Sequence, residues 1–430
     1  MTVLLLLSIL VAFACMTRGW LRGQEVAMPA VTLWALVLAG PHDAELALQK
    51  GFAEFARIAL LFTAVAVPTH MLQRAGALRW AGLVLGEGLG IGVDRWGVRP
   101  GLLVPGACLF LTYTMAALFH NTAAILVCTS IIVEICQSYQ LRTLPVLSGA
   151  LVASNLSGFS TKWGDTPNLT EAAIWGLRHQ DFFLEILPIN IGLMCLLSAG
   201  VSALLSRDNH TTAQFSLTYA RVGFRRARQA QAHSIDWRLL CIGSIGLAIA
   251  VGGPWIAPSH EIALSALASL FCCVAERATH RTETLLTLGL DTYATLCAIF
   301  VLAQVLTHSG IGIGEVIQAG LKGSGTSVWA IAVASYLGTL CTEAASWATA
   351  VASIIHASSP THAAAWALGA GICAGSSSLV TAASAGIILT RETQDFKEEA
   401  RVTFGAYLPF GLGVSLGMLA YYTVVLSILW

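Results

Sequence analysis

The chain has 430 residues, of which 56% are hydrophobic and only 11% are charged. Soluble domains carry roughly 25% charged residues, so this chain has too little charge to cover a water-facing surface, and a soluble globular protein is excluded. Lys and Arg balance Asp and Glu at 23 each, which gives no indication of a nucleic-acid partner.

Apolar runs recur from one end of the chain to the other. A membrane-spanning helix needs ~20 predominantly apolar residues. The continuous candidates are 2–17, 26–40, 54–72, 101–119, 122–136, 182–205, 238–252, 260–275, 284–306, 326–342 and 402–428, and the short or interrupted ones are 77–93, 143–176, 344–356 and 363–390. We therefore expect an all-α integral membrane protein with about 10–12 spans.

The first apolar run, 2–17, has no basic region before it and no A-x-A cleavage site behind it. We expect a span here rather than a cleaved signal peptide. The 11 cysteines of the chain lie mostly inside apolar runs and form neither a C-x-x-C pair nor a Cys/His cluster. Such cysteines act as small hydrophobic residues, so no metal site and no cofactor is expected.

One long polar segment, 206–238, divides the chain almost in half. It contains only two acidic residues, against six arginines: Arg207, Arg221, Arg225, Arg226, Arg228 and Arg238. Because cytoplasmic loops of membrane proteins carry an excess of Lys and Arg, we expect a basic cytoplasmic loop that contacts anionic membrane lipid. We do not expect it to bind nucleic acid.

The two halves repeat the same order of polar interruptions. The cluster LFHNTAA at 118–124 corresponds to LCTEAAS at 340–346, and the segment 154–169 aligns without gaps to 374–389. In that alignment Ser157 lies over Ser377 and Thr161 over Thr381. An internal duplication with one broken helix in each half is typical of secondary transporters, whose ion sites lie at the ends of the half-helices.

The first-half pair LFHNTAAILVCTSIIVEI and LVASNLSGFSTKWGDTPNL resembles the ion-transporter superfamily. That group includes arsenite permeases, NhaD-type sodium/proton antiporters and divalent-anion/sodium symporters. The features that carry the resemblance are an Asn-Thr pair, here Asn121-Thr122, and a turn of the G-x-P-P-N type, here 164–168.

The resemblance implies two inverted repeats, each with a re-entrant hairpin and a discontinuous helix. It also implies a homodimer, an elevator-like motion and a location in the bacterial inner membrane. We divide the chain into N-terminal scaffold spans (1–50), a first repeat (51–205), the basic loop (206–238), connecting spans (239–282) and a second repeat (283–430).

Three departures from the family pattern bear on the substrate. The second hairpin tip reads Thr342-Glu343 in place of Asn-Thr, the second break has no Pro-Asn turn, and Lys162 places an ammonium group inside the first break. Because dicarboxylate symport calls for a matched pair of Asn-Thr tips, these departures disfavour it.

Neutral oxygens and carboxylates at the two tips and breaks are the candidate ion ligands. They are Asn121, Thr122, Asn155, Ser157, Thr161, Asp165, Thr166, Asn168, Thr342, Glu343, Ser346, Ser377, Ser378 and Thr381. Glu343 and Asp165 are the candidates for proton coupling, because a carboxylate inside a membrane is costly and takes up a proton. Asp165 has an alternative role as a helix N-cap, and Lys162 is expected to modulate the charge of the site.

We interpret the chain as a secondary active transporter that moves a small ion coupled to protons, with sodium/proton antiport as the leading interpretation and Na⁺ or H⁺ as the coupling ion. An anion carrier for arsenite, a sulfate-like ion or a di- or tricarboxylate is the alternative, and an ion channel is the alternative class. No nucleophile–base pair points to an enzyme, and no GxxxxGK[ST] loop points to ATP-driven transport.

Overall fold

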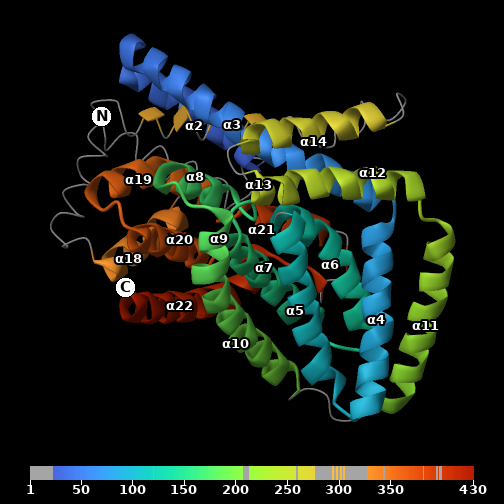
Figure 1. The fold of residues 1–430 in the computed structure, drawn as a ribbon. Coiled ribbons are helices and arrows are strands. Elements are labelled where there is room, and N and C mark those ends of the chain that lie inside the picture. The colour runs from blue at the N-terminus through green and yellow to red at the C-terminus, as the bar shows by residue number, and fades with distance from the viewer. Residues whose placement is uncertain are drawn as a thin grey trace.

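A computed structural model describes residues 23–430 of the chain, apart from 120, 207–212, 258–259, 277–292, 295–296, 299–300, 303, 306–326, 342–343, 381, 394–395 and 397–399. The described residues form helices and turns, with no strand among them (Figure 1). The expected all-α fold is therefore confirmed.

The first half of the chain folds into consecutive helices that match the apolar runs closely. They are α2 (Gly23–Ala39), α3 (Pro41–Arg74), α4 (Ala77–Trp96), α5 (Pro100–Phe119), α6 (Asn121–Ser138), α7 (Thr143–Ser160), α8 (Thr166–Trp175), α9 (His179–Asp181), a π-helical turn (Phe182–Ile186) and α10 (Leu187–Ser206). The run 143–176 is divided between α7 and α8, so the predicted break in this helix is confirmed.

The second half likewise has helices that mostly follow the apolar runs of the sequence. Its helices are α11 (Ala213–His233), α12 (Trp237–Leu247), a π-helical turn (Ala248–Gly252), α13 (Gly253–Ile256), α14 (Glu261–Ala275), α18 (Val328–Cys341), α19 (Ala344–Ser358), α20 (His362–Ser376), α21 (Ser384–Glu392) and α22 (Phe404–Leu429). The run 363–390 is divided between α20 and α21, which confirms the second predicted break.

Most of the described helices fall into two groups. Helices α2, α3, α12, α13 and α14 lie together across the top of Figure 1, and α5–α10 with α18–α22 form the larger body below them. Arg74 at the end of α3 forms an ion pair of 2.5 Å with Glu276, directly after α14, and the Glu276 side chain is only 1% exposed. This contact joins two helices of the upper group.

The larger body has one hydrophobic core to which both halves contribute. Buried residues of α5, α6, α7 and α10 pack with buried residues of α18, α19, α20 and α22. Helices α18 and α20 pack closely, because Gly371 and Gly375 face the backbone and side chains of Ala332, Ser335 and Thr339. Small residues spaced four apart allow membrane helices to approach in this way.

Most of the segment 206–238, predicted as a basic loop, is the helix α11. Its Phe224 is buried and stacks on Tyr139, directly after α6, with ring centroids 6.3 Å apart. Its Arg228 forms an ion pair of 3.0 Å with Glu87 of α4. The polar sequence therefore encodes an amphipathic helix with one packed face, while Arg225 and Arg226 are exposed.

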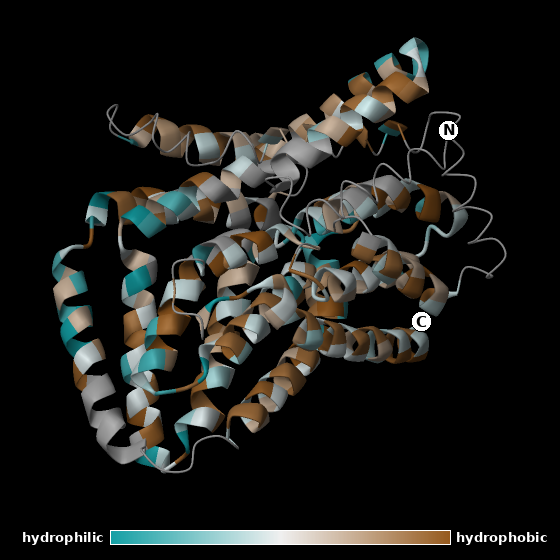
Figure 2. Cartoon of the chain, turned by 180° about the vertical axis from the view of Figure 1, so that it is seen from behind, coloured by the Kyte–Doolittle hydropathy of each residue, from teal (hydrophilic) through white to brown (hydrophobic). Residues whose placement is uncertain are grey.

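Three described helices are long and apolar enough to cross a membrane: Pro100–Leu118, His179–Ser206 and Phe404–Leu429. Five shorter apolar helices accompany them in the described part of the chain: Pro29–Ala39, Val127–Ser138, Trp237–Ala250, Ile262–Ala275 and Val328–Leu340. Figure 2 shows hydrophobic residues along α10 and α22 and hydrophilic ones along α11. The expected total of spans stays a prediction, since the runs 2–17 and 284–306 lie wholly or largely outside the described residues.

Candidate functional site

The break between α7 and α8 is built by local sequence signals. Thr161 leaves the helix in an extended conformation (φ −137°, ψ 148°), and Asp165 begins α8 as its N-cap. The Asp165 carboxylate accepts a hydrogen bond of 2.9 Å from the backbone N–H of Thr166. Pro167 follows within the first turn, where a missing N–H costs nothing. The N-cap role expected for Asp165 is confirmed.

Each broken helix is hydrogen-bonded to the start of a helix in its own half. The backbone N–H of Asn121 donates to the carbonyl of Gly164 in the first break, at 3.1 Å. The backbone N–H of Ala344 donates to the carbonyl of Ala382 in the second break, at 3.2 Å. The same main-chain contact therefore occurs twice, at α6 and at α19, and it joins the predicted hairpin tips to the predicted breaks.

The two halves also meet directly at these positions. The Asn155 side-chain amide on α7 donates to the Ser377 hydroxyl at the end of α20, at 3.3 Å. The Cys373 thiol donates to the Asn155 carbonyl at 3.5 Å, and the Tyr407 hydroxyl donates to the Ser377 carbonyl at 2.6 Å. The structure thus brings together the first-half residue Asn155 and the second-half residue Ser377.

Most predicted ligands that the structure describes are removed from solvent. Eight of them are buried: Asn121, Asn155, Ser157, Thr161, Thr166, Asn168, Ser377 and Ser378. Lys162 and Asp165 are half-buried at the break. Asn155 Oδ1 and Thr161 Oγ1 are buried oxygens without a hydrogen-bond partner among the described residues. Such oxygens are chemically suited to a cation.

Other predicted ligands have their hydrogen bonds committed to the protein itself. Asn168 donates to the carbonyls of Gly158 at 2.5 Å and Thr161 at 2.7 Å, so it braces the break. The Ser157 hydroxyl donates to the Tyr113 carbonyl, and the Ser378 hydroxyl donates to the Gly375 carbonyl, both at 2.5 Å.

Five predicted ligands are not placed by the structure. Residues Thr342, Glu343 and Thr381 lie outside the described part of the chain, and so do the side chains of Thr122 and Ser346.

The structure also contains a buried polar network that sequence reasoning missed. Asn190 of α10 donates to the Leu156 carbonyl at 3.0 Å and to the Ser160 hydroxyl at 2.9 Å, and it accepts from Tyr422 of α22 at 2.5 Å. Tyr113 bonds to the same Ser160 hydroxyl at 2.6 Å. These side chains connect α5, α7, α10 and α22 beside the first break. In the sequence, the one signal for this network was Asn190, a polar residue inside the apolar run 182–205.

Glu171 is a second residue that the sequence analysis did not single out. It lies on α8, six positions after Asp165, and is 0% exposed. The sequence feature that could have indicated Glu171 was a carboxylate directly after the predicted break.

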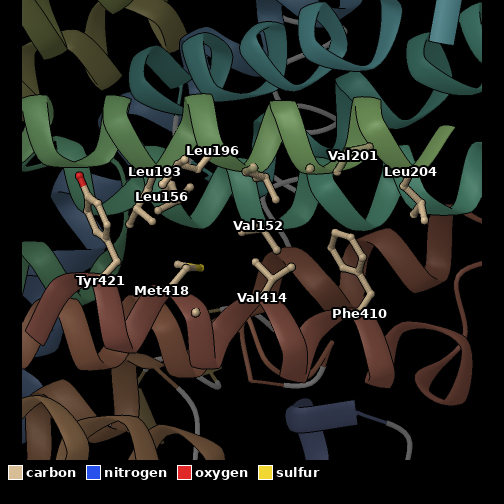
Figure 3. A pocket seen from close by; sticks show the side chains of 13 residues that line it. Val152, Leu156, Leu193, Leu196, Val201, Leu204, Phe410, Val414, Met418 and Tyr421 are labelled. Carbon is tan, nitrogen blue, oxygen red and sulfur yellow. The ribbon is translucent and has the colours of Figure 1, made fainter. Parts of the chain in front are cut away.

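A separate cavity of about 290 Å³ lies between α7, α10 and α22 (Figure 3). Its walls are almost wholly carbon, from Val152, Leu156, Leu193, Leu196, Leu197, Val201, Leu204, Phe410, Val414, Met418 and Tyr421. A cavity of this chemistry accommodates alkyl groups and offers no ligands to an ion. The polar break is therefore the better candidate for a transport site.

Comparison with known proteins agrees with a transport function. The sequence profile of the family described as "CitMHS: Citrate transporter" matches residues 2–386. The magnetosome protein MamN of Paramagnetospirillum magneticum is 26% identical over 246 residues, which cover 56% of this chain and 52% of that protein. A 46 kDa membrane protein of Mycobacterium leprae is 32% identical over 94 residues, or 21% of this chain and 22% of that protein. The chain thus spans about half the length of the relative MamN that it matches.

The crystal structure of the YdaH transporter of Alcanivorax borkumensis, described as having an unusual topology, has a TM-score of 0.56 with this chain. The two are 15% identical, and the likeness covers 93% of this chain and 98% of that one, which shows a shared fold. The resemblance to ion transporters that the Asn121-Thr122 pair and the 164–168 turn indicated is confirmed by the family match.

Proposed function

This chain belongs to the CitMHS citrate transporter family of ion transporters, and on that premise we propose that it couples the movement of a small ion to protons, with sodium/proton exchange as the leading assignment. The chain is an integral multi-pass membrane protein and a transporter, not an enzyme. Its place in a bacterial cytoplasmic membrane is part of the proposal, supported by bacterial relatives.

The observation that supports this proposal is the oxygen-rich first break. Asn155 Oδ1 and Thr161 Oγ1 are buried without hydrogen-bond partners among the described residues, and the Asp165 carboxylate stands a few residues further along the chain. Hard cations prefer oxygen ligands of this kind. The Asp165 carboxylate already accepts a hydrogen bond from the N–H of Thr166 at the start of α8. Its negative charge offsets the positive end of the helix dipole, which makes this end less attractive to an anion.

The twofold main-chain contact supports the proposed mechanism. Two inverted repeats with re-entrant hairpins would each place a hairpin tip against a broken helix, as the Asn121–Gly164 and Ala344–Ala382 hydrogen bonds do. A transporter with such a site exposes it to one membrane face and then to the other. The elevator-like motion and the homodimer implied by the family resemblance are part of this proposal.

A carboxylate anion such as citrate is the second candidate, because the description of the family names it. Lys162 lies in the first break and is half-buried, where an ammonium group could attract an anion. In this assignment Lys162 binds substrate, whereas in the first it competes with the cation for Asp165.

Purified protein in liposomes with an internal pH dye tests the proposal. Pulses of Na⁺, Li⁺, K⁺, citrate, sulfate and arsenite are compared with and without an imposed membrane potential. A proton flux that follows Na⁺ or Li⁺ supports exchange, and a proton flux that follows citrate supports the second candidate. An ion flux that continues down its gradient without any proton movement would contradict both assignments and favour a channel.

Substitutions at Lys162 and Asp165 separate the two substrates. For a cation carrier, Asp165→Asn is expected to weaken the apparent cation affinity several-fold, because a half-buried carboxylate attracts a cation more strongly than a surface carboxylate does. Lys162→Met is expected to leave the cation affinity equal or improved. For an anion carrier, Lys162→Met is expected to weaken the affinity and Asp165→Asn is not. Apparent affinities in the liposome assay decide, and two unchanged affinities would place both side chains outside the site.

A further inference from the structure

A fully buried carboxylic acid lies between the two halves of the molecule. Glu171 on α8 is 0% exposed, and neither of its carboxylate oxygens has a hydrogen-bond partner among the described residues. Burying an ionised carboxylate without partners costs many kcal/mol, so such a group is buried only with a proton bound. An acidic residue inside a membrane protein is a functional candidate for this reason.

The packing around Glu171 shows what holds the carboxyl group away from water. Helix α8 packs on α19 and α20 of the second half. A side chain at Gly369 of α20 would place its Cβ only 2.8 Å from Glu171 Oε2 and against the ring of Phe159. The Phe159 ring in turn makes edge-to-face contacts with Trp366 and Tyr422, at 6.5 and 5.8 Å between centroids. The carboxyl group therefore occupies the space that a glycine of the opposite half leaves, beside an aromatic wall.

The other titratable groups of the surrounding helices do not neutralise Glu171. Asp165, the N-cap of the same helix, is itself a carboxylate and so offers Glu171 no positive charge. On α20, Cys373 is buried and donates to Asn155. On α19, His356 contacts the ring of Trp175, with 5.2 Å between centroids. Because neither Glu171 oxygen has a hydrogen-bond partner among the described residues, the geometry favours a bound proton over an ion pair.

From this geometry we infer that Glu171 carries a transported proton, and that the contact of α8 with α20 encloses it. The inference rests on the proposed proton-coupled function and adds a residue to it. In the enclosed state Glu171 is neutral. It gains its proton from water on one face of the membrane and loses it to water on the other, when α8 and α20 separate enough to admit water to the carboxyl group.

The experiment compares Glu171→Gln with wild type in liposomes. Gln has the volume of Glu but holds no exchangeable acid proton, so we expect net proton-coupled flux to be lost and the exchange of labelled substrate to continue without dependence on pH. Glu134→Gln, an exposed carboxylate on α6, is the matched control and is expected to keep both activities. If Glu171→Gln couples protons as wild type does, Glu171 is a packing residue and the inference is overturned.

A second measurement avoids any variant that fails to fold. A membrane-permeant carbodiimide modifies protonated carboxyl groups in apolar surroundings, and mass spectrometry locates the modified residue. We expect modification of Glu171 in wild-type protein during turnover, decreasing as the pH is raised. Absence of modification during turnover at every pH overturns the inference. Wild-type liposomes that move no protons with any ion would instead contradict the proposed function, and the inference with it.

Discussion

Gly164 illustrates how a single residue determines the geometry of the first break. A Cβ at this position would lie 2.5 Å from Thr161 Oγ1 and 2.7 Å from the carbonyl of Gly158. The carbonyl of Gly164 also accepts the hydrogen bond from Asn121. No side chain fits without moving the break, because protein interiors are packed closely.

We therefore expect Gly164→Ala to abolish transport in liposomes while the protein still inserts into the membrane. Gly200→Ala on α10 is the control, because nothing lies within 4 Å of a Cβ there. Size-exclusion chromatography confirms that both variants are folded. Normal transport by Gly164→Ala would show that the break tolerates displacement and would weaken its assignment as the site.

Residues with local signals were predictable from sequence, and residues defined by distant contacts were not. The N-cap Asp165 and Pro167 belong to one short segment whose conformation they determine. By contrast, the burial of Glu171 arises from α19 and α20, more than a hundred positions away in sequence. The Asn190–Tyr422 hydrogen bond likewise joins helices that no local pattern relates.

Helix α20 depends on glycines for its contact with α18. A Cβ on Gly371 would lie 2.7 Å from the Cβ of Ser335 and closer still to the carbonyl of Ala332. We expect Gly371→Ala to lower the stability by about 1–3 kcal/mol, because an overpacked interface must shift its backbone. Thermal denaturation in detergent, followed by fluorescence-detected size-exclusion chromatography, measures the change.

Gly417→Ala on α22 is the matched control for that prediction, since nothing lies within 4 Å of a Cβ there. It is expected to be neutral or slightly stabilising, by up to ~1 kcal/mol, because alanine favours helix more than glycine does. Equal melting temperatures of Gly371→Ala and wild type would mean that α18 and α20 can separate without cost.

The ends of most described helices follow from apolar runs and cap residues, but two elements do not. The run 77–93 was expected to be short or broken by its glycines, and it is the continuous helix α4. Its Gly82 and Gly86 lie against Ile131 and Phe224, so they serve close packing. Helix α11 lies in the segment predicted as a basic loop, and its packed face is defined by contacts with α4 and α6. In both elements the tertiary contacts, and not the composition, determine which face packs.

At the scale of the whole molecule, the basic segment predicts the orientation in the membrane. By the positive-inside rule, the arginines of 206–238 predict that this segment lies in the cytoplasm. Gln229 is exposed on α11, so Gln229→Cys in a background without other cysteines should react with an impermeant thiol reagent only in inside-out vesicles. A permeant reagent serves as the control for reactivity. Labelling in intact cells would invert the proposed topology.

The two main-chain hydrogen bonds at the breaks bear on how the halves could diverge after a duplication. A bond between a backbone N–H and a backbone carbonyl does not depend on the identity of either side chain. The residues around Asn121 and Ala344 can therefore change by mutation while the contacts to Gly164 and Ala382 persist. The first tip reads Asn-Thr and the second Thr-Glu. The copies of a duplicated half would thus be free to specialise, one toward neutral ligands and the other toward an acidic one, without losing these main-chain contacts.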